Sequence, residues 1–232
     1  MSPLEQSLRG IAGQHSPAVL AHSLQAEDMV LTDIIARARL PIEIFVLDTG
    51  RLHGDSLALI DRIRRHYALE VQVYAPDQDA VADYVRRHGR DAFYGGVELR
   101  KRCCEIRKVE PLRRAKQGLD SWISGRKAFQ SVTRQNLPRF EIEDGRLKVN
   151  PLGDWTKADL DAYFEAHDLP RHPLEAKGYL SVGCEPCTST VAPGEDPRAG
   201  RWRGWDKTEC GIHAPGTALD EGELPPGYEP AF

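Results

Sequence analysis

The fold follows from one stretch, Ile42-Glu43-Ile44-Phe45-Val46-Leu47-Asp48-Thr49-Gly50, in which a strand-length apolar run ends in a polar turn. A second run of this kind, 18–23, precedes it, and a third, 71–74, follows it. Helical patterns near 28–38 and 55–67 separate the three runs. Strands that alternate with helices of this length predict parallel β-α-β units with right-handed crossovers.

The rest of the chain extends this pattern. Residues 3–15 read as a short helix, 121–125 as another strand, and 140–150 as a hairpin around Asp144-Gly145. Thr156 is an N-cap for a helix that reaches His167. We therefore expect an α/β protein with a mostly parallel, twisted sheet flanked by helices, which is Rossmann-like.

Two segments depart from the alternation. The middle of the chain reads as mostly helical up to Pro111, and after Cys187 the chain is rich in Gly and Pro. There we expect little regular structure and a mobile C-terminal tail. We place the boundary near Ala192, with a core domain at 1–192 and a tail at 193–232.

The composition is ordinary for a globular protein of 232 residues, with 41% apolar and 28% charged residues. The net charge of −4 argues against broad nucleic-acid binding. No apolar run approaches the length that spans a bilayer, and no secretory signal is visible at the N-terminus, so we expect no membrane partner. An odd number of cysteines without an export signal favours the cytoplasm.

Four of the five cysteines form two tight pairs, Cys103-Cys104 and Cys184-x-x-Cys187, separated by a long gap. Four thiolates brought together by folding are the ligand set of a structural zinc or an iron–sulfur cluster. Adjacent cysteines can reach two different metal atoms of one cluster, whereas a single zinc prefers looser spacing. From spacing alone both metals stay open, and so does a disulfide between the two segments.

Basic residues gather near the first cysteine pair, although charge runs are usually solvated helix faces. If this segment is helical, Lys108 lies one turn after Cys104, and Arg107 bears the same relation to Cys103. A second basic group, which includes Arg198 and Arg201, precedes the fifth cysteine. Beside paired cysteines, these cations indicate a small anionic ligand.

Small ligands of parallel sheets bind beyond the carboxyl ends of the strands. That edge would hold Ser23 and its loop to Asp28, the turn Asp48-Thr49-Gly50, and Gly125. The Ser23 loop contains no glycine, so it is not a Walker-type phosphate loop. Taken alone, each of these turns fits an ordinary N-cap equally well.

Cys210 is the unpaired cysteine, and it lies between Lys207 and His213 in the glycine-flanked tail. A thiolate is the reactive form of cysteine, and nearby cations lower the pKa of a thiol. Cys210 is therefore a candidate nucleophile, the alternative being an incidental surface thiol.

Together these motifs resemble the assimilatory sulfonucleotide reductases, specifically the cluster-containing adenylyl-sulfate (APS) reductases. The resemblance runs from about Ser23 to His213. Its most specific stretches are KRCCEIRKVEPL (101–112), SWISGR (121–126), QSVTR (130–134), GYLSVGCEPCT (178–188), RAGRW (198–202) and ECGIH (209–213).

The resemblance implies an adenine-nucleotide-hydrolase-like fold, with one 4Fe–4S cluster per chain bound by Cys103, Cys104, Cys184 and Cys187. It also implies that Cys210 attacks the sulfate sulfur of APS, that AMP leaves, and that thioredoxin or a glutaredoxin-like reductant releases sulfite from the Cys210 thiosulfonate. The substrate-binding positions that it matches are Ser23, Asp48, Thr49, Gly50, Lys108, Gly125, Arg134, Arg198, Arg201 and His213.

The sequence departs from the family pattern at three places. No redox domain follows His213, so the electrons are expected from a separate protein. The Ser23 loop carries Leu24-Gln25 where relatives commonly have an aromatic residue and a glycine, and the tryptophan run near Trp205 is thinner.

Three rival functions are weighed against APS reduction. One is reduction of the 3′-phosphorylated substrate PAPS, alone or with APS, although enzymes restricted to PAPS typically lack the cluster cysteines. The second is an ATP-using thiolation enzyme, whose Ser-Gly-Gly-x-Asp-Ser loop is absent. The third is a zinc-stabilised adenine-nucleotide sensor. The sequence leaves the oligomeric state open, a homo-oligomer included.

Overall fold

The computed structural model describes residues 1–128, 137–205 and 216–219. The chain begins with an alternation of helices and strands that continues to β3. These elements are α1 (Pro3–Gln14), β1 (Ala18–Ala21), α2 (Ala26–Ala38), β2 (Ile42–Leu47), α3 (Gly54–Tyr67) and β3 (Gln72–Tyr74). Helices dominate the next part: α4 (Gln78–His88), the 3₁₀-helix η1 (Ala92–Tyr94), α5 (Val97–Cys104), the π-helix η2 (Glu105–Val109) and α6 (Glu110–Ala115).

The remaining elements complete the sheet and the ligand side of the molecule. They are β4 (Ser121–Ile123), β5 (Phe140–Glu143), β6 (Arg146–Val149), α7 (Lys157–His167), the 3₁₀-helices η5 (Glu175–Lys177) and η6 (Glu185–Cys187), and β7 (Thr217–Ala218). None of the helices in this described part of the chain combines the length and apolar character that crossing a lipid bilayer requires.

Seven strands of the described residues form one sheet in the order β3-β2-β1-β4-β6-β5-β7. The pairs from β3 to β6 along this order are parallel, and β5 is antiparallel to both β6 and β7. The strand order reverses at β1, because β2 and β3 lie on one side of it and β4 on the other. Such a switch point opens a crevice beyond the carboxyl ends of β1 and β4, where open α/β sheets bind ligands.

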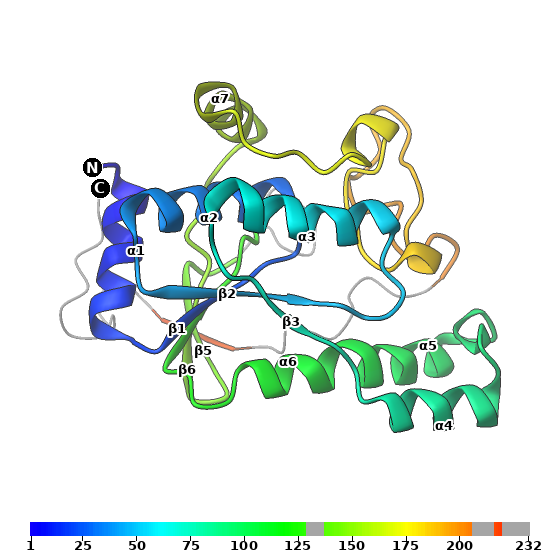
Figure 1. The fold of residues 1–232 in the computed structure, drawn as a ribbon. Coiled ribbons are helices and arrows are strands. Elements are labelled where there is room, and N and C mark those ends of the chain that lie inside the picture. The colour runs from blue at the N-terminus through cyan, green and yellow to red at the C-terminus, as the bar shows by residue number, and fades with distance from the viewer. Residues whose placement is uncertain (129–136, 206–215, 220–232) are drawn as a thin grey trace.

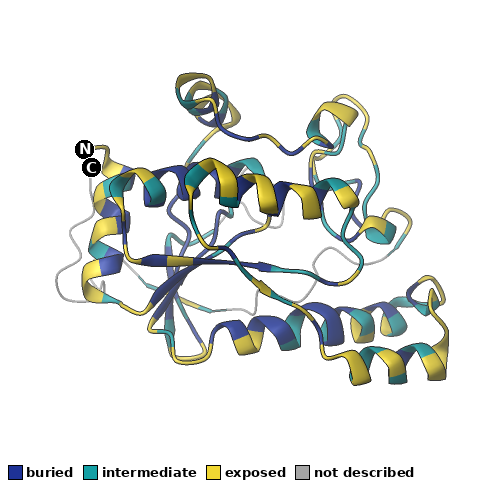
Figure 2. Ribbon diagram, viewed as in Figure 1, coloured by how far each residue is buried: buried dark blue, intermediate teal, exposed yellow. Residues whose placement is uncertain are grey.

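Helices cover both faces of the sheet, with α1, α2 and α3 on one side and α4, α5 and α6 on the other (Figure 1). Alternate strand residues serve the two faces, as the pleat requires. Leu20 and Ile44 join the larger core with the first set of helices, whereas Phe45 and Trp122 pack with Leu112 of α6. The buried sides of these helices turn toward the sheet (Figure 2).

The β5–β6 hairpin carries a buried network of charges beneath Trp122. Lys148 has no exposed surface, and its Nζ lies 2.6 Å from Glu143 Oε2 and 3.1 Å from Glu141 Oε1. Lys116 binds Glu143 Oε1 at 2.6 Å. The two ammonium groups lie 4.9 and 4.8 Å from the centre of the Trp122 ring, so the indole helps to compensate their charge.

The fold class is confirmed, and so are the predicted helices and strands at 3–15, 42–47, 55–67 and 140–150. The helical middle, however, continues past Pro111 to Ala115. Pro111 lies in the first turn of α6, directly after the π-helix η2, whose wide turn ends at the bond from Glu110 N to Glu105 O. The strand β7 was not predicted, since two residues without an apolar pattern give no signal.

Helix α7 borders the ligand side and begins as the sequence predicts. The Thr156 side chain accepts from Asp159 N at 3.2 Å, and Asp159 Oδ2 accepts from Thr156 N at 2.7 Å, which makes a capping box.

Replacing Thr156 with Ala should lower the free energy of unfolding by about 1 kcal/mol, because one N-terminal N–H loses its acceptor. Urea denaturation of the apo-protein measures this loss. The exposed Glu165→Ala on the same helix is the control and should change the value by less than about 0.5 kcal/mol. Equal losses in both variants would contradict the role of the cap.

Candidate functional site

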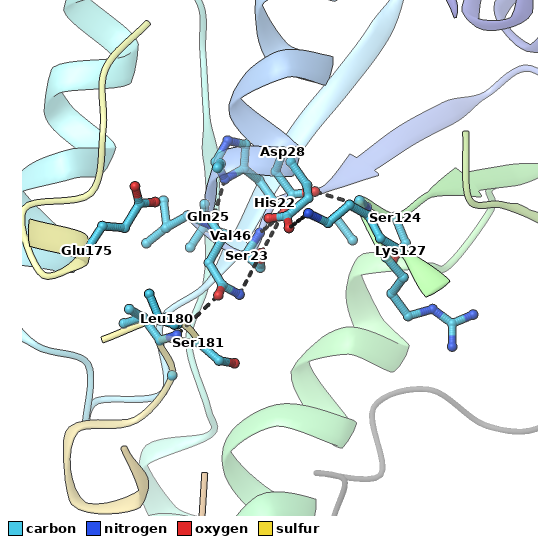
Figure 3. A pocket seen from close by; sticks show the side chains of 18 of the residues that line it. His22, Ser23, Gln25, Asp28, Val46, Ser124, Lys127, Glu175, Leu180 and Ser181 are labelled. Atoms are coloured by element: carbon cyan, nitrogen blue, oxygen red, sulfur yellow. Dashed lines mark hydrogen bonds and ion pairs between the residues drawn. The ribbon is translucent and has the colours of Figure 1, made fainter. Parts of the chain in front are cut away.

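A cavity of about 510 Å³ opens beyond the carboxyl ends of β1, β2 and β4, which is a usual size for a small-ligand site. Its floor comes from the loop after β1 and the loop after β4 (Figure 3). Helix α7 and the segment 179–183 border it on another side. The cavity therefore lies at the switch point that the strand order creates.

Asp28 joins the two loops of the floor. One carboxylate oxygen accepts from Ser23 N at 2.7 Å and from Ser23 Oγ, and the other accepts from Gly125 N at 3.0 Å (Figure 3). Burial raises the pKa of Asp28 to about 7, although the bonds from Ser23 and Gly125 oppose this rise. The pKa of this carboxyl group therefore lies well above the ordinary range of an aspartate.

Gly125 is needed for this close approach of the loops. A Cβ at this position would collide with Asp28 Oδ1 and would come within 2.9 Å of Glu27 Cβ. Glu27 is itself held by Lys127 at 2.9 Å, so it has little room to retreat.

The loop after β1 also reaches the cysteine-bearing segment. Gln25 Oε1 accepts from Val182 N at 3.1 Å, two residues before Cys184 (Figure 3). Leu24 holds a positive φ of 66°, and its N–H donates to the buried His22 Nδ1 at 2.9 Å. Burial lowers the pKa of His22 to about 3, so His22 is neutral and able to accept this bond.

Seven Lys and Arg residues of the described chain border the cavity, namely Lys108, Arg126, Lys127, Lys157, Arg171, Arg198 and Arg201. Three of these, Lys108, Arg198 and Arg201, are the predicted anion-binding residues. The side chain of Arg201 is buried and donates to Val182 O at 3.2 Å. Lys108 is also buried, and it borders both this cavity and a second, smaller one. Lys108 therefore lies between the two cavities.

The second cavity is bordered by all four paired cysteines, Cys103, Cys104, Cys184 and Cys187. None of the four forms a disulfide, so the disulfide alternative is wrong. Among the described residues, no three His, Cys, Asp or Glu side chains are arranged around a single ion. The four thiols instead surround a common space.

The turn after β2 holds the second cysteine pair in place. Leu52 forms a bridge with Cys184, and Arg51 O accepts from Glu185 N at 2.8 Å. Thr49 Oγ1 lies 3.2 Å from Cys184 Sγ and accepts from Arg51 N. A hydroxyl that accepts one bond still carries its own proton, so Thr49 is able to donate to the sulfur.

Two buried guanidinium groups compensate for negative charge at this second cavity. Arg100 is 1% exposed, and its Nη1 lies 3.6 Å from Cys187 Sγ, whereas its Nη2 has no hydrogen-bond partner. Arg107 donates to Thr49 O at 2.8 Å. Within the described ranges neither arginine has an ion pair with a carboxylate. Buried charges require compensation, so these cations fit anionic thiolates bound to a metal or cluster.

Burial raises the pKa of both Cys103 and Cys187, and each thiol also faces the charge of Cys184. Arg107 opposes this rise at Cys103, and Arg100, Lys108 and Arg201 oppose it at Cys187. These two buried thiols therefore ionise most readily when a metal binds to the sulfur and the proton is released.

The predicted site residues fall into three groups. Ser23, Thr49, Lys108, Gly125, Arg198 and Arg201 border the larger cavity. Asp48 and Gly50 do not: Asp48 Oδ1 accepts from Gly50 N at 2.8 Å, and a Cβ on Gly50 would meet Arg107 Nη1 at 3.2 Å. These two residues shape the turn that presents Thr49. Arg134, Cys210 and His213 lie outside the described residues.

Sequence analysis placed Gln25 and Asp28 in the loop at the ligand edge and Arg100 in the basic group near the first cysteine pair, but it gave none of the three a role of its own. Arg100 had a usable signal, because it lies three residues before Cys103 on the same helix and so near the same face. The only sequence signal for Asp28 was its position in the first turn of a helix, and acidic residues are common there for reasons unrelated to a site.

An α/β sheet with a cation-lined crevice at its switch point is typical of proteins that bind a nucleotide-type anion, and here four cysteines border a second cavity beside it. Residues 17–190 match the phosphoadenosine phosphosulfate reductase domain. The chain therefore belongs to this family, and the resemblance inferred from its motifs is confirmed.

Two similar proteins are both named adenosine 5′-phosphosulfate reductase. The chain is 51% identical over 216 residues to the adenosine 5′-phosphosulfate reductase of Burkholderia cepacia, covering 90% of this chain and 86% of that protein. It is 50% identical over 200 residues to the adenosine 5′-phosphosulfate reductase of Allochromatium vinosum, covering 84% and 78%. A crystal structure of phosphoadenylyl-sulfate reductase from Candida auris, in a phosphate complex, has a TM-score of 0.68 at 26% identity, covering 82% of this chain and 91% of that one.

Gly125→Ala should weaken binding of AMP by about tenfold or more, because the new methyl group displaces the Asp28 carboxylate that joins the two loops. Isothermal titration calorimetry measures the affinity. Gly13→Ala, where a Cβ meets nothing within 4 Å, is the matched control and should bind as the wild type does. Undiminished affinity in the Gly125 variant would show that the loop junction does not shape the nucleotide site.

Proposed function

We propose that this protein is a thioredoxin-dependent adenylyl-sulfate reductase, which converts APS to sulfite and AMP in sulfate assimilation and cysteine biosynthesis. The observation that carries this proposal is the position of Lys108, which borders both the nucleotide-sized cavity and the four-cysteine cavity. The names of the relatives from Burkholderia cepacia and Allochromatium vinosum support APS as the substrate.

The larger cavity binds the nucleotide, with the loops after β1 and β4 beneath it and Gly125 near the adenosine. The sulfate end points toward Lys108, Arg198 and Arg201, which border the cavity and match the anion-binding positions that the family resemblance implies. Arg134 and His213 complete the anion site. These positive charges offset the repulsion that arises when an anionic thiolate approaches an anionic sulfate.

Cys210 is the nucleophile. Its thiolate sulfur forms a bond with the sulfate sulfur of APS, the bond from that sulfur to the bridging phosphate oxygen breaks, and AMP leaves with the electron pair. Cys210 is left as a thiosulfonate. A thiolate of thioredoxin, or of a glutaredoxin-like reductant, attacks Cys210 Sγ and releases sulfite, and its second thiol restores the Cys210 thiolate and leaves the reductant as a disulfide.

Cys103, Cys104, Cys184 and Cys187 hold one 4Fe–4S cluster, since four unbridged thiols surround a common space with buried cations beside them. When bound, the cluster supplies a fixed anionic charge and a structural link between the two cysteine segments. Thr49 and Arg100 would orient the thiolates of Cys184 and Cys187 around it, and Arg107 would support Thr49.

The reduced state of the paired thiols fits a cytoplasmic protein, where glutathione and thioredoxin keep thiols free. We retain 1–192 as the nucleotide- and cluster-binding domain and 193–232 as the segment that carries the nucleophile. The substrate is a small molecule, and nucleic acid is not a partner.

Cys210→Ser should reduce sulfite formation from APS by about a thousandfold or more, because the attacking thiolate is lost. AMP affinity and iron content should stay at wild-type values, since Cys210 is neither a cluster ligand nor a nucleotide contact. Sulfite release and calorimetry measure the two properties. Sulfite formation that survives the substitution would refute the nucleophile assignment.

Purification without oxygen should yield about four irons and four acid-labile sulfides per chain, with a visible absorption band. Cys184→Ser should lose both, whereas Cys210→Ser should keep them. Zinc in a colourless protein would refute the cluster assignment and favour the nucleotide-sensor alternative.

A comparison of turnover on APS and on PAPS tests the choice of substrate. A strong preference for PAPS would refute APS as the substrate.

A further inference from the structure

Arg100 has contacts that the proposed reaction does not explain. Its side chain is almost fully buried, at 1% exposed, and it belongs to α5, three residues before Cys103. Arginine is rarely buried to this extent without a carboxylate partner, and within the described residues Arg100 has none. The groups that the Arg100 guanidinium contacts therefore indicate why this arginine is buried.

The guanidinium group lies between the second cysteine pair and an aromatic ring. Its Nε donates to Phe93 O at 3.0 Å, and its Nη1 lies 3.6 Å from Cys187 Sγ. Its Cζ lies 4.5 Å from the centre of the Trp205 ring, within the range of a cation–π contact. Trp205 is the last described residue before the stretch 206–215, which contains Cys210.

A second connection joins the same two places through the backbone. Cys187 O accepts from Trp202 N at 3.3 Å, and Trp202 O accepts from Trp205 N at 2.9 Å. The backbone turn sets where residue 205 lies, but it does not fix the direction of the indole. The stack on Arg100 supplies that direction, because a planar guanidinium can bind a thiolate at its edge and a ring on its face.

We infer that Arg100 is a positioning residue, which couples the charge of the four-cysteine centre to the start of the segment that carries Cys210. The sulfur of Cys187 holds the guanidinium in place, and the guanidinium holds Trp205. This inference rests on the proposed function only for the role of Cys210. The contact between Arg100 and Trp205 can be tested without any reaction.

The direct test is ¹⁹F NMR of the cluster-loaded protein labelled with 5-fluorotryptophan. The chain has four tryptophans, so the Trp205 signal can be assigned from its loss in Trp205→Phe. Arg100→Lys keeps the positive charge beside Cys187 but removes the planar face. It should shift and narrow the Trp205 signal while iron content remains normal. Arg102→Lys, an exposed change on the same helix, should leave the spectrum as in the wild type.

The second test is kinetic and uses the same chain. Arg100→Lys and Trp205→Leu should each lower kcat by about tenfold with KM for APS within about twofold, since they misplace the nucleophile and leave the nucleotide site intact. The double variant should be no slower than either single variant, because both remove one interaction.

An unchanged Trp205 signal in Arg100→Lys would overturn the inference, and so would additive losses in the double variant. A wild-type protein that forms no sulfite from APS would refute the proposed function instead, while the ¹⁹F spectra would still decide whether Arg100 positions Trp205.

Discussion

The junction between the Gly125 N–H and the Asp28 carboxylate is the contact on which the ligand side depends. The strand order alone separates the loops after β1 and β4 and leaves a crevice between them. Asp28 closes the base of that crevice by accepting from both loops, and Gly125 allows this because it has no Cβ. The carboxyl group is buried and has a raised pKa, which shows that the junction is maintained at an electrostatic cost.

The charge distribution around the crevice follows from this floor. A carboxyl group lies beneath the cavity at the β1–β4 junction, and the cations Lys108, Arg198 and Arg201 lie on its border. Lys108 also borders the cysteine cavity, so one buried lysine belongs to both sites. A change at the cysteine cavity would therefore also reach the larger cavity through Lys108.

Much of this could be predicted from the sequence. Apolar runs followed by polar turns gave the parallel sheet, and the position of those turns gave Ser23, Thr49 and Gly125 at the ligand edge. The prediction was incomplete where the local folding of a turn, or a contact between distant segments, decides which side chain reaches the site. Asp48 and Thr49 are neighbours in one turn, yet only Thr49 borders the cavity, because Asp48 folds back onto Gly50 N. The role of Arg100 depends on Cys187 and Trp205, which no local pattern connects to it.

The π-helix η2 has a consequence for how this chain can vary in length. Its wide turn, closed by the bond from Glu110 N to Glu105 O, holds one residue more than an α-helical turn would. Each residue turns a regular α-helix by about 100°, and the wide turn between Cys104 and Pro111 takes up one residue without passing that rotation on to α5. The loss of one residue there would convert the wide turn to an α-helical one and leave α5 and α6 in nearly the same relative direction. Such a deletion would instead change which side chains of 105–109 face the cysteine cavity, Arg107 and Lys108 among them.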